Sequence, residues 1–273
     1  MSSTRPVALV TGASRGMGAS TAVALAHAGY DVAVTARTVR EGAGTLPGSL
    51  ETVTAAIESA GVRALPLAMD LTDHDAVAAT ADATLDTFGR VDLLCNIGIY
   101  QGGGSGMFLE TPIEELAKHL DADVLAPAIL LQKLLPAMLE QEGGVVVNMS
   151  SFVVFNDPPG PPDKNGWALG YASAKAGIDR FAGALNAEFG DRGILAYTVD
   201  PGFVAYGDAF ADQVDRYEGM PVTPPDAIGA AIVWLVTSPD AKRLLHKRIY
   251  LPAITQKYDL LPGWGGPGTA FPS

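Results

Sequence analysis

The sequence contains one cysteine, Cys95, and only 18 Lys and Arg against 30 Asp and Glu. A single cysteine excludes an intrachain disulfide and a cysteine-based metal cluster, and no metal is expected. The formal net charge of −12 argues against a nucleic-acid partner, because binding to phosphates depends on a surplus of basic side chains. No basic-then-apolar signal segment opens the chain, and no uninterrupted apolar stretch approaches the length of a membrane helix. We therefore expect a cytoplasmic protein with no membrane partner.

The 273 residues are 48% apolar and 18% charged, a composition that supports a large core under an ordinary polar surface. No long Ser/Gly or charged linker divides the chain, so residues 1–273 are predicted to form a single domain. Three segments interrupt the regular pattern: residues 41–49, a Pro-rich insertion at 155–170 and an atypical tail at 251–273. All three are predicted to be loops or excursions.

Short apolar runs rich in β-branched residues alternate with longer Ala/Leu-rich stretches of helical spacing. The runs, predicted to be buried strands, are residues 7–10, 31–35, 64–69, 91–95, 145–149 and 195–199. The predicted helices are residues 19–28, 49–60, 73–88, 113–141, 171–189 and 225–237. Continuous apolar strands with helical crossovers predict an α/β fold, a doubly wound parallel sheet in a Rossmann-like three-layer α/β/α arrangement.

A glycine-rich turn, TGASRGMG, joins the first predicted strand to the first helix and carries Gly12, Gly16 and Gly18. Glycines there allow a tight turn and let a pyrophosphate approach the backbone, while the helix N-terminus attracts the anion. A glycine-rich turn without a ligand is the alternative for such a motif alone. The preceding strand and following helix favour a dinucleotide site.

The spacing TGxxxGxG resembles that of the short-chain dehydrogenase/reductase family, and further motifs follow in the family's order from residue 7 to about 204. The motif CNIG at 95–98 is a partial match to the family's NNAG. The resemblance implies an NAD(P)-dependent oxidoreductase acting on CH–OH or C=O groups. The cofactor-binding residues that it implies are Gly12, Ser14, Arg15, Gly16, Met17, Gly18, Asp70, Leu71, Asn96, Gly98, Tyr171, Lys175, Pro201, Gly202 and Val204.

The end of the second predicted strand indicates which nicotinamide cofactor is used. An acid there would bind the adenosine ribose and repel a 2′-phosphate, but the sequence has Ala36 followed by Arg37. Arg37, helped by Arg15, is suited to charge-assisted bonds with the phosphate. We therefore expect NADP as the cofactor, with NAD as the alternative. If neither arginine contacts a ligand, both are ordinary solvated surface charges.

The motif YASAK places Tyr171 and Lys175 four residues apart, so that both side chains share one helix face. A nearby ammonium favours an ionised phenol, which makes Tyr171 a candidate general acid or base. In the family, the second serine of a run such as VVVNMSS polarises the substrate carbonyl, and this role falls on Ser151. Ser150 is the neighbouring candidate, although successive residues at a strand end point to opposite sides.

Two positions depart from the family pattern. Asp123 stands where the family has an Asn that links the lysine to a proton-carrying water chain, and Tyr206 replaces the usual Thr after Pro201, Gly202 and Val204. An ionised Asp123 close to Lys175 would favour the ammonium form of the lysine and alter proton relay. The insertion between Ser151 and Tyr171 is expected to cover the substrate pocket or to be a tolerated surface loop.

The resemblance also predicts the substrate and the assembly. A substrate lid is expected around residues 203–222, where the apolar side chains Phe203, Tyr206, Phe210, Tyr217 and Met220 favour a medium-sized apolar small-molecule carbonyl or alcohol. A homotetramer or homodimer is expected through the helices at 113–141 and 171–189. Two other functions stay open: a 3-oxoacyl-thioester reductase acting on acyl carriers, and a non-catalytic dinucleotide-binding sensor or scaffold.

Overall fold

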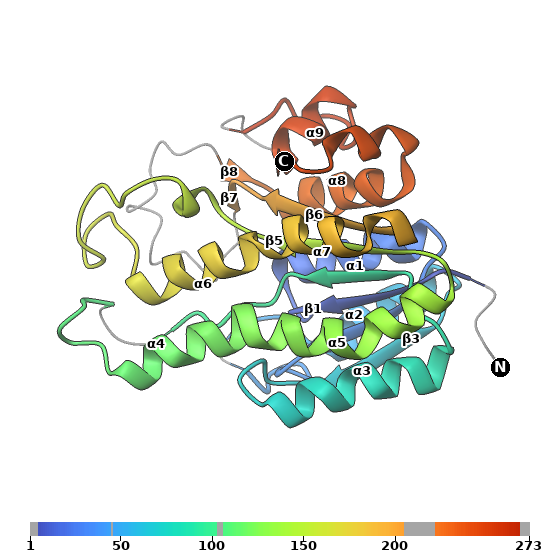
Figure 1. Ribbon diagram of the computed structural model, residues 1–273, viewed down its shortest axis with the longest axis horizontal. Coiled ribbons are helices and arrows are strands. Elements are labelled where there is room, and N and C mark those ends of the chain that lie inside the picture. The colour runs from blue at the N-terminus through green and yellow to red at the C-terminus, as the bar shows by residue number, and fades with distance from the viewer. Residues whose placement is uncertain (1–4, 45, 103–105, 205–221, 268–273) are drawn as a thin grey trace.

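The computed structural model describes residues 5–44, 46–102, 106–204 and 222–267, and its centre is a seven-stranded parallel sheet in the order β3-β2-β1-β4-β5-β6-β9 (Figure 1). Its strands are β1 (Val7–Thr11), β2 (Asp31–Ala36), β3 (Ala64–Ala68), β4 (Leu93–Asn96), β5 (Gly144–Met149), β6 (Ile194–Asp200) and β9 (Arg248–Tyr250). The strand order reverses direction between β1 and β4. Ligands of such sheets bind outside the carboxyl ends of the strands at that point.

The helices follow the predicted positions closely. They are α1 (Gly16–His27), α2 (Leu50–Ser59), α3 (His74–Phe88), α4 (Ile113–Leu120), α5 (Ala126–Glu140), α6 (Leu169–Asp179), α7 (Phe181–Phe189), α8 (Pro225–Thr237) and α9 (Leu251–Lys257). Local sequence fixes several ends: Ser49 caps α2, Asp73 caps α3 and Gly89 ends α3 in the left-handed conformation. The short strands β7 (Phe203–Val204) and β8 (Val222–Thr223) pair with each other.

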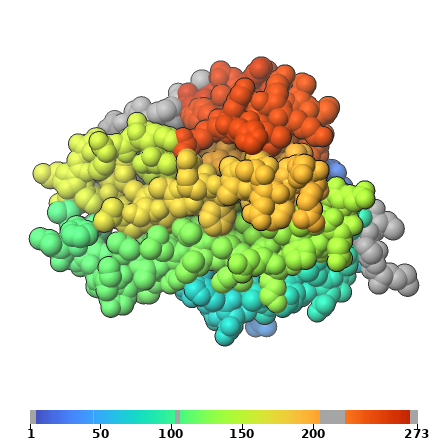
Figure 2. All heavy atoms as spheres, viewed as in Figure 1, coloured from blue at the N-terminus to red at the C-terminus, as the bar shows by residue number. Residues whose placement is uncertain are grey.

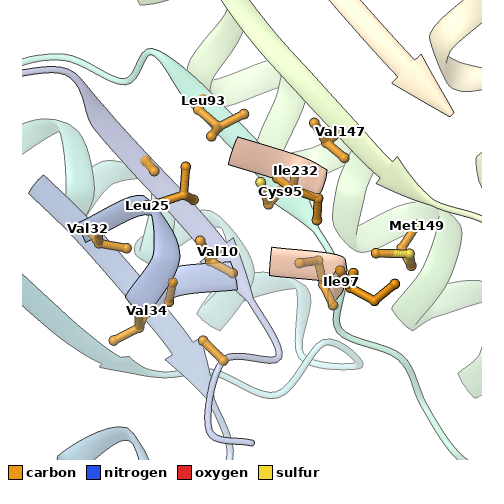
Figure 3. Packing of buried hydrophobic residues seen from close by; sticks show 14 of the residues in the cluster. Val10, Leu25, Val32, Val34, Leu93, Cys95, Ile97, Val147, Met149 and Ile232 are labelled. Atoms are coloured by element: carbon orange, nitrogen blue, oxygen red, sulfur yellow. The ribbon is translucent and has the colours of Figure 1, made fainter. Parts of the chain in front are cut away.

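Apolar residues of the strands divide between two cores, one on each face of the sheet. Val10 and its neighbours pack with α1, α2 and α8 in the core that Figure 3 shows, where Leu25 and Ile232 meet the strand side chains. Leu9, which points to the opposite face, packs with α3, α5 and α7. Figure 2 shows this second layer covering one side of the molecule. The predicted doubly wound, three-layer fold is therefore confirmed.

One continuous helical stretch, Ile113–Glu140, joins α4 and α5 through a π-helical turn at Asp121–Leu125. By length and composition it could cross a membrane, but charged and polar residues such as Asp121, Asp123 and Lys133 interrupt it, so it is not an uninterrupted apolar stretch. The stretch packs against α3, and 44% of its most apolar window is buried within the protein. A helix at the core of a folded domain passes the same test.

Two expectations need correction. The helix predicted over 171–189 is divided at Arg180 into α6 and α7. The tail was predicted to be irregular from residue 251, but Leu251–Lys257 forms α9, directly after the edge strand β9, which the sequence pattern did not reveal. Ile249 and Leu251 are buried in the first core and explain why this segment is ordered. A three-residue strand is too short to show an alternating pattern.

Candidate active site

The glycine turn after β1 is packed so closely that side chains are excluded. A Cβ atom at Gly18 would overlap the carbonyl oxygen of Gly12, and a Cβ at Gly12 would lie 2.5 Å from Gly98 Cα. Thr11 holds the two turns together, because its hydroxyl accepts hydrogen bonds of 3.0 Å from the backbone N–H groups of Ile97 and Gly98. The turn after β4 thereby forms one wall beside the glycine turn.

The N-terminus of α1 is open to an anion. Arg15 at the N-cap makes no capping hydrogen bond, and the first turn carries no acidic residue. The unpaired N–H groups and the helix dipole therefore point toward the cavity at this end of the sheet. The glycine cradle and the free helix end fit the pyrophosphate of a dinucleotide.

A cavity runs from this turn toward the ends of β2, β3 and β4. It is lined by nine residues predicted to bind cofactor: Gly12, Ser14, Arg15, Met17, Gly18, Arg37, Asp70, Leu71 and Gly98. It is also lined by residues that the sequence motifs did not indicate, including Thr38, Leu46, Thr72, Ile99, Tyr100 and Gln101. These lie on loops whose path depends on tertiary packing, so no local signal identified them.

The two arginines near the adenosine end have different surroundings. Arg37 is 64% exposed, with its guanidinium 4.0 Å from the Asp70 carboxylate. Arg15 donates hydrogen bonds of 2.9 to 3.2 Å to the carbonyl oxygens of Pro47, Leu46 and Gly48. These hydrogen bonds hold the 46–48 loop against the glycine turn. The expected contribution of Arg15 to phosphate binding remains a prediction.

Other predicted cofactor residues lie outside the walls of this cavity. Asn96 is buried within the sheet, where its amide donates to Asn148 at 2.8 Å. Gly202 has a φ of 68° and donates its N–H to Asp200 at 2.8 Å. Burial raises the pKa of Asp200, although this hydrogen bond and Arg248 oppose the shift. Gly16, Pro201 and Val204 are likewise absent from the cavity lining, and Tyr206 lies outside the described residues together with Phe210, Tyr217 and Met220.

The catalytic candidates come from β5 and α6, which pack against each other. Ser151 follows β5 and is buried, with a hydroxyl that accepts a long 3.5 Å hydrogen bond from Val153 N–H. Lys175 is buried one helical turn after Tyr171, and its Nζ lies 5.9 Å from the centre of the Tyr171 ring. Lys175 also donates to the carbonyl oxygen of Met149 at 3.0 Å. The two elements therefore bring Tyr171 and Lys175 to the end of β5.

Ser150 and Ser151 have distinct hydrogen-bonding partners. The Ser150 hydroxyl donates to the Asp179 carboxylate at 3.0 Å, and Arg248 Nε donates to the same carboxylate at 2.7 Å. Burial alone would raise the pKa of Asp179, but the hydrogen bonds from Arg248, Arg180 and Ser150 together lower it. The Ser150 hydroxyl thus donates its hydrogen bond within a buried structural cluster. The Ser151 hydroxyl accepts a hydrogen bond and, among the described residues, has no acceptor for its own hydrogen.

Asp123 lies in the π turn between α4 and α5 and faces Lys175. Its Oδ2 is 3.0 Å from Lys175 Nζ, and the two side chains are only 1% and 4% exposed. The register deduced from the sequence therefore brings this acid to the lysine. An amide at this position would carry no charge, so the buried carboxylate changes the electrostatics around the YASAK pair.

Comparisons with known proteins agree with this arrangement. A family model described as short chain dehydrogenase matches residues 6–217. The chain is 33% identical over 204 residues to a short chain dehydrogenase of Pseudocercospora fijiensis, a match that covers 72% of this chain but only 59% of that protein. It is 32% identical over 210 residues to a 3-oxoacyl-[acyl-carrier-protein] reductase of Staphylococcus aureus, covering 76% and 78% of the two chains.

Solved structures extend the similarity to complexes with both nicotinamide cofactors. A metagenomic short-chain oxidoreductase in complex with NADP is 28% identical, with a TM-score of 0.69 over 86% of this chain and 92% of that one. A 3-oxoacyl-[acyl-carrier protein] reductase from Brucella melitensis in complex with NAD is 26% identical, with a TM-score of 0.77 over 92% and 96%. The protein belongs to the short chain dehydrogenase family. It is an NAD(P)-dependent oxidoreductase of CH–OH or C=O groups, which confirms the family and enzyme class expected from the sequence.

Proposed function

We propose that the enzyme prefers NADP and reduces an apolar carbonyl compound or oxidises the corresponding alcohol. Arg37 is the residue assigned to the 2′-phosphate, because it follows Ala36 at the end of β2 and its exposed guanidinium lines the cavity. The open N-terminus of α1 supports binding of the pyrophosphate. Pro201, Gly202 and Val204 are assigned to the nicotinamide side on the family resemblance. NAD remains the alternative, since related structures contain either cofactor.

The observation that carries this proposal is the packing of α6, with Tyr171 and Lys175, against the end of β5, which Ser151 follows. The bound nicotinamide would supply or accept the hydride. Ser151 would donate a hydrogen bond to the substrate oxygen, where negative charge develops during reduction. Tyr171 would deliver the proton to that oxygen or remove it in the opposite direction, and the Lys175 ammonium would stabilise the phenolate.

The surroundings of these three residues support an apolar substrate and an oligomeric enzyme. Phe152, next to Ser151, is 42% exposed and meets the Trp167 ring edge-on at 5.5 Å between centroids, with Trp167 in the Pro-rich insertion.

Ile113 on α4 and Leu125 in the π turn are 69% and 44% exposed, which is suited to contact with a second copy in a homodimer or homotetramer. A cytoplasmic location is also part of the proposal.

Cofactor oxidation tests the catalytic assignment directly. Purified enzyme would be given NADPH or NADH with a panel of ketones, aldehydes and 3-oxoacyl thioesters, and the decrease in nicotinamide absorbance would be followed. We expect preference for NADPH and a loss of about 10²- to 10⁴-fold in kcat for Tyr171→Phe. Tyr258→Phe is the matched control, because this tyrosine stacks on Trp234 in the α8–α9 region. Undiminished turnover by Tyr171→Phe would refute the assignment.

A second candidate function is reduction of 3-oxoacyl thioesters on an acyl carrier, favoured by the similarity to reductases of that name. An acidic carrier protein would require a basic docking surface, which the net charge of −12 does not favour. Higher kcat/KM for a carrier-bound thioester than for the same acyl group on a small thiol would support this candidate. Tight NADPH binding without turnover of the whole panel would instead support a sensor or scaffold.

A further inference from the structure

A buried carboxylate accompanies the buried lysine of the proposed catalytic group. Asp123 Oδ2 lies 3.0 Å from Lys175 Nζ, but the contact lacks the alignment of a hydrogen bond. Among the described residues, neither oxygen of the Asp123 carboxylate has a hydrogen-bond partner, and the side chain is 1% exposed. Burial of an ionised acid is costly unless a nearby charge compensates it. The Lys175 ammonium supplies that compensation.

His119 lies on the same helical stretch, one turn before Asp123, and is also buried. Its ring occupies a narrow space in front of α6: a Cβ added to Gly170 would lie 2.6 Å from His119 Cδ2, and one added to Gly102 would lie 3.0 Å from Nε2. His119 Nδ1 has no hydrogen-bond partner among the residues that the structure describes. Burial lowers the pKa of His119, although the charges of Asp123 and Glu115 oppose this shift. A neutral imidazole therefore covers this side of the ion pair at neutral pH.

The other charged groups near this site neutralise one another. Glu115 accepts a 2.5 Å hydrogen bond from Lys118 and a 2.6 Å hydrogen bond from the Tyr100 hydroxyl. Among the described residues, Glu115 on α4 and Tyr100 on the loop after β4 face His119, and Tyr171 on α6 faces Lys175. Of these, Tyr171 is the proposed proton-transfer residue, and its ring centre lies 5.9 Å from Lys175 Nζ.

A carboxylate beside Lys175 reduces the positive potential that the ammonium exerts on Tyr171. A lone ammonium would stabilise the phenolate, whereas a closely paired ammonium and carboxylate act on a third group as a dipole. Low exposure keeps water from screening either charge. The pair therefore stabilises negative charge on the Tyr171 oxygen less than an unpaired lysine would.

We propose that Asp123 is a positioning residue that balances the charge of Lys175 beside the buried His119, and so weakens the attraction of the ammonium for negative charge on the Tyr171 oxygen. This inference rests on the proposed function, because it concerns the same proton donor. The protonated phenol is the form that carbonyl reduction requires.

The test is the pH dependence of kcat/KM for a carbonyl substrate with saturating NADPH. Reduction declines where the phenol ionises, and in Asp123→Asn we expect this decline to begin about one pH unit lower, because the balancing charge is removed. Asp121→Asn is the matched control: it lies in the same π turn, but its carboxylate pairs with His74 at 3.2 Å. We expect its profile to coincide with that of the wild type. A profile of Asp123→Asn that is unchanged or shifted to higher pH overturns the proposal.

A second measurement applies even if Asp123→Asn does not fold. The wild-type enzyme with 13Cζ-labelled tyrosine would be titrated by NMR, with the Tyr171 signal assigned by its loss in Tyr171→Phe. A protonated Tyr171 at pH 8 is the expected result, and a phenolate there overturns the proposal. The two hypotheses fail separately: full turnover by Tyr171→Phe refutes the proposed function. An unchanged or upward-shifted profile of an active Asp123→Asn, or a Tyr171 phenolate at pH 8 in the active wild type, refutes only the role of Asp123.

Discussion

Alanine substitution of two adjacent serines should affect stability in one case and activity in the other. The Ser150 hydroxyl donates at 3.0 Å to the buried Asp179 carboxylate, which keeps hydrogen bonds from Arg248 and Arg180 if the serine is removed. Losing one of several hydrogen bonds to a buried charge costs about 1–3 kcal/mol of the free energy of unfolding. At about 2–4 °C per kcal/mol for a chain of this size, Ser150→Ala should lower Tm by several degrees. Its kcat should remain within about threefold of the wild type.

Ser151→Ala should show the opposite behaviour. Within the described part of the chain, the Ser151 hydroxyl makes only a 3.5 Å contact with Val153 N–H, so its removal should change Tm by little. Loss of a donor to the developing oxyanion reduces kcat by about 10²- to 10³-fold in comparable sites.

The assays are thermal unfolding of the NADPH-free enzymes and steady-state oxidation of NADPH with the best substrate of the panel. Both variants lose one hydroxyl from neighbouring residues, so each serves as the control for the other. If Ser150→Ala abolished turnover while Ser151→Ala did not, the assignment of the two serines from their partners would be refuted. Equal losses of activity without a change in Tm would refute it as well.

Two further predictions concern the cofactor and acid stability. Arg37→Ala should raise KM for NADPH by about 10- to 100-fold and leave KM for NADH unchanged, since charge-assisted bonds to a phosphate are lost. Arg15→Gln should raise both KM values alike, because it releases the 46–48 loop; selective loss of NADPH in this variant would favour a direct phosphate contact. Asp179 has a lowered pKa in the folded state, so its stabilising contribution is present above the unfolded-state value and is lost as pH falls through the folded-state value. Urea titrations should therefore show that Asp179→Asn is destabilised at pH 6 and approaches the wild type as the pH falls through the folded-state pKa of Asp179. A destabilisation that does not change with pH would contradict this linkage.

The central fold was predictable because its signals are local and repeated. Buried strands have uninterrupted apolar sequences. The glycines of the Gly12–Gly18 turn indicate a tight bend in which backbone segments lie close together. Where the signal was short or depended on packing, prediction failed. Strand β9 has three residues, and the division between α6 and α7 at Arg180 interrupts a stretch of continuous helical periodicity.

In the candidate site, the sequence identified the residue types, but it did not reveal the neighbours that surround them. YASAK identified Tyr171 and Lys175 from spacing alone, and the family register indicated Asp123, but no pattern revealed that His119 would be buried one turn before that acid. His119 becomes significant only when Gly170 and Gly102, from segments far apart in the sequence, are seen to leave space for its ring. A histidine in a helix carries no signal of burial by itself, since the neighbours that bury it belong to other elements. The charge balance around Lys175 is therefore a tertiary property, and a side chain added at Gly170 should disturb it indirectly, by displacing His119.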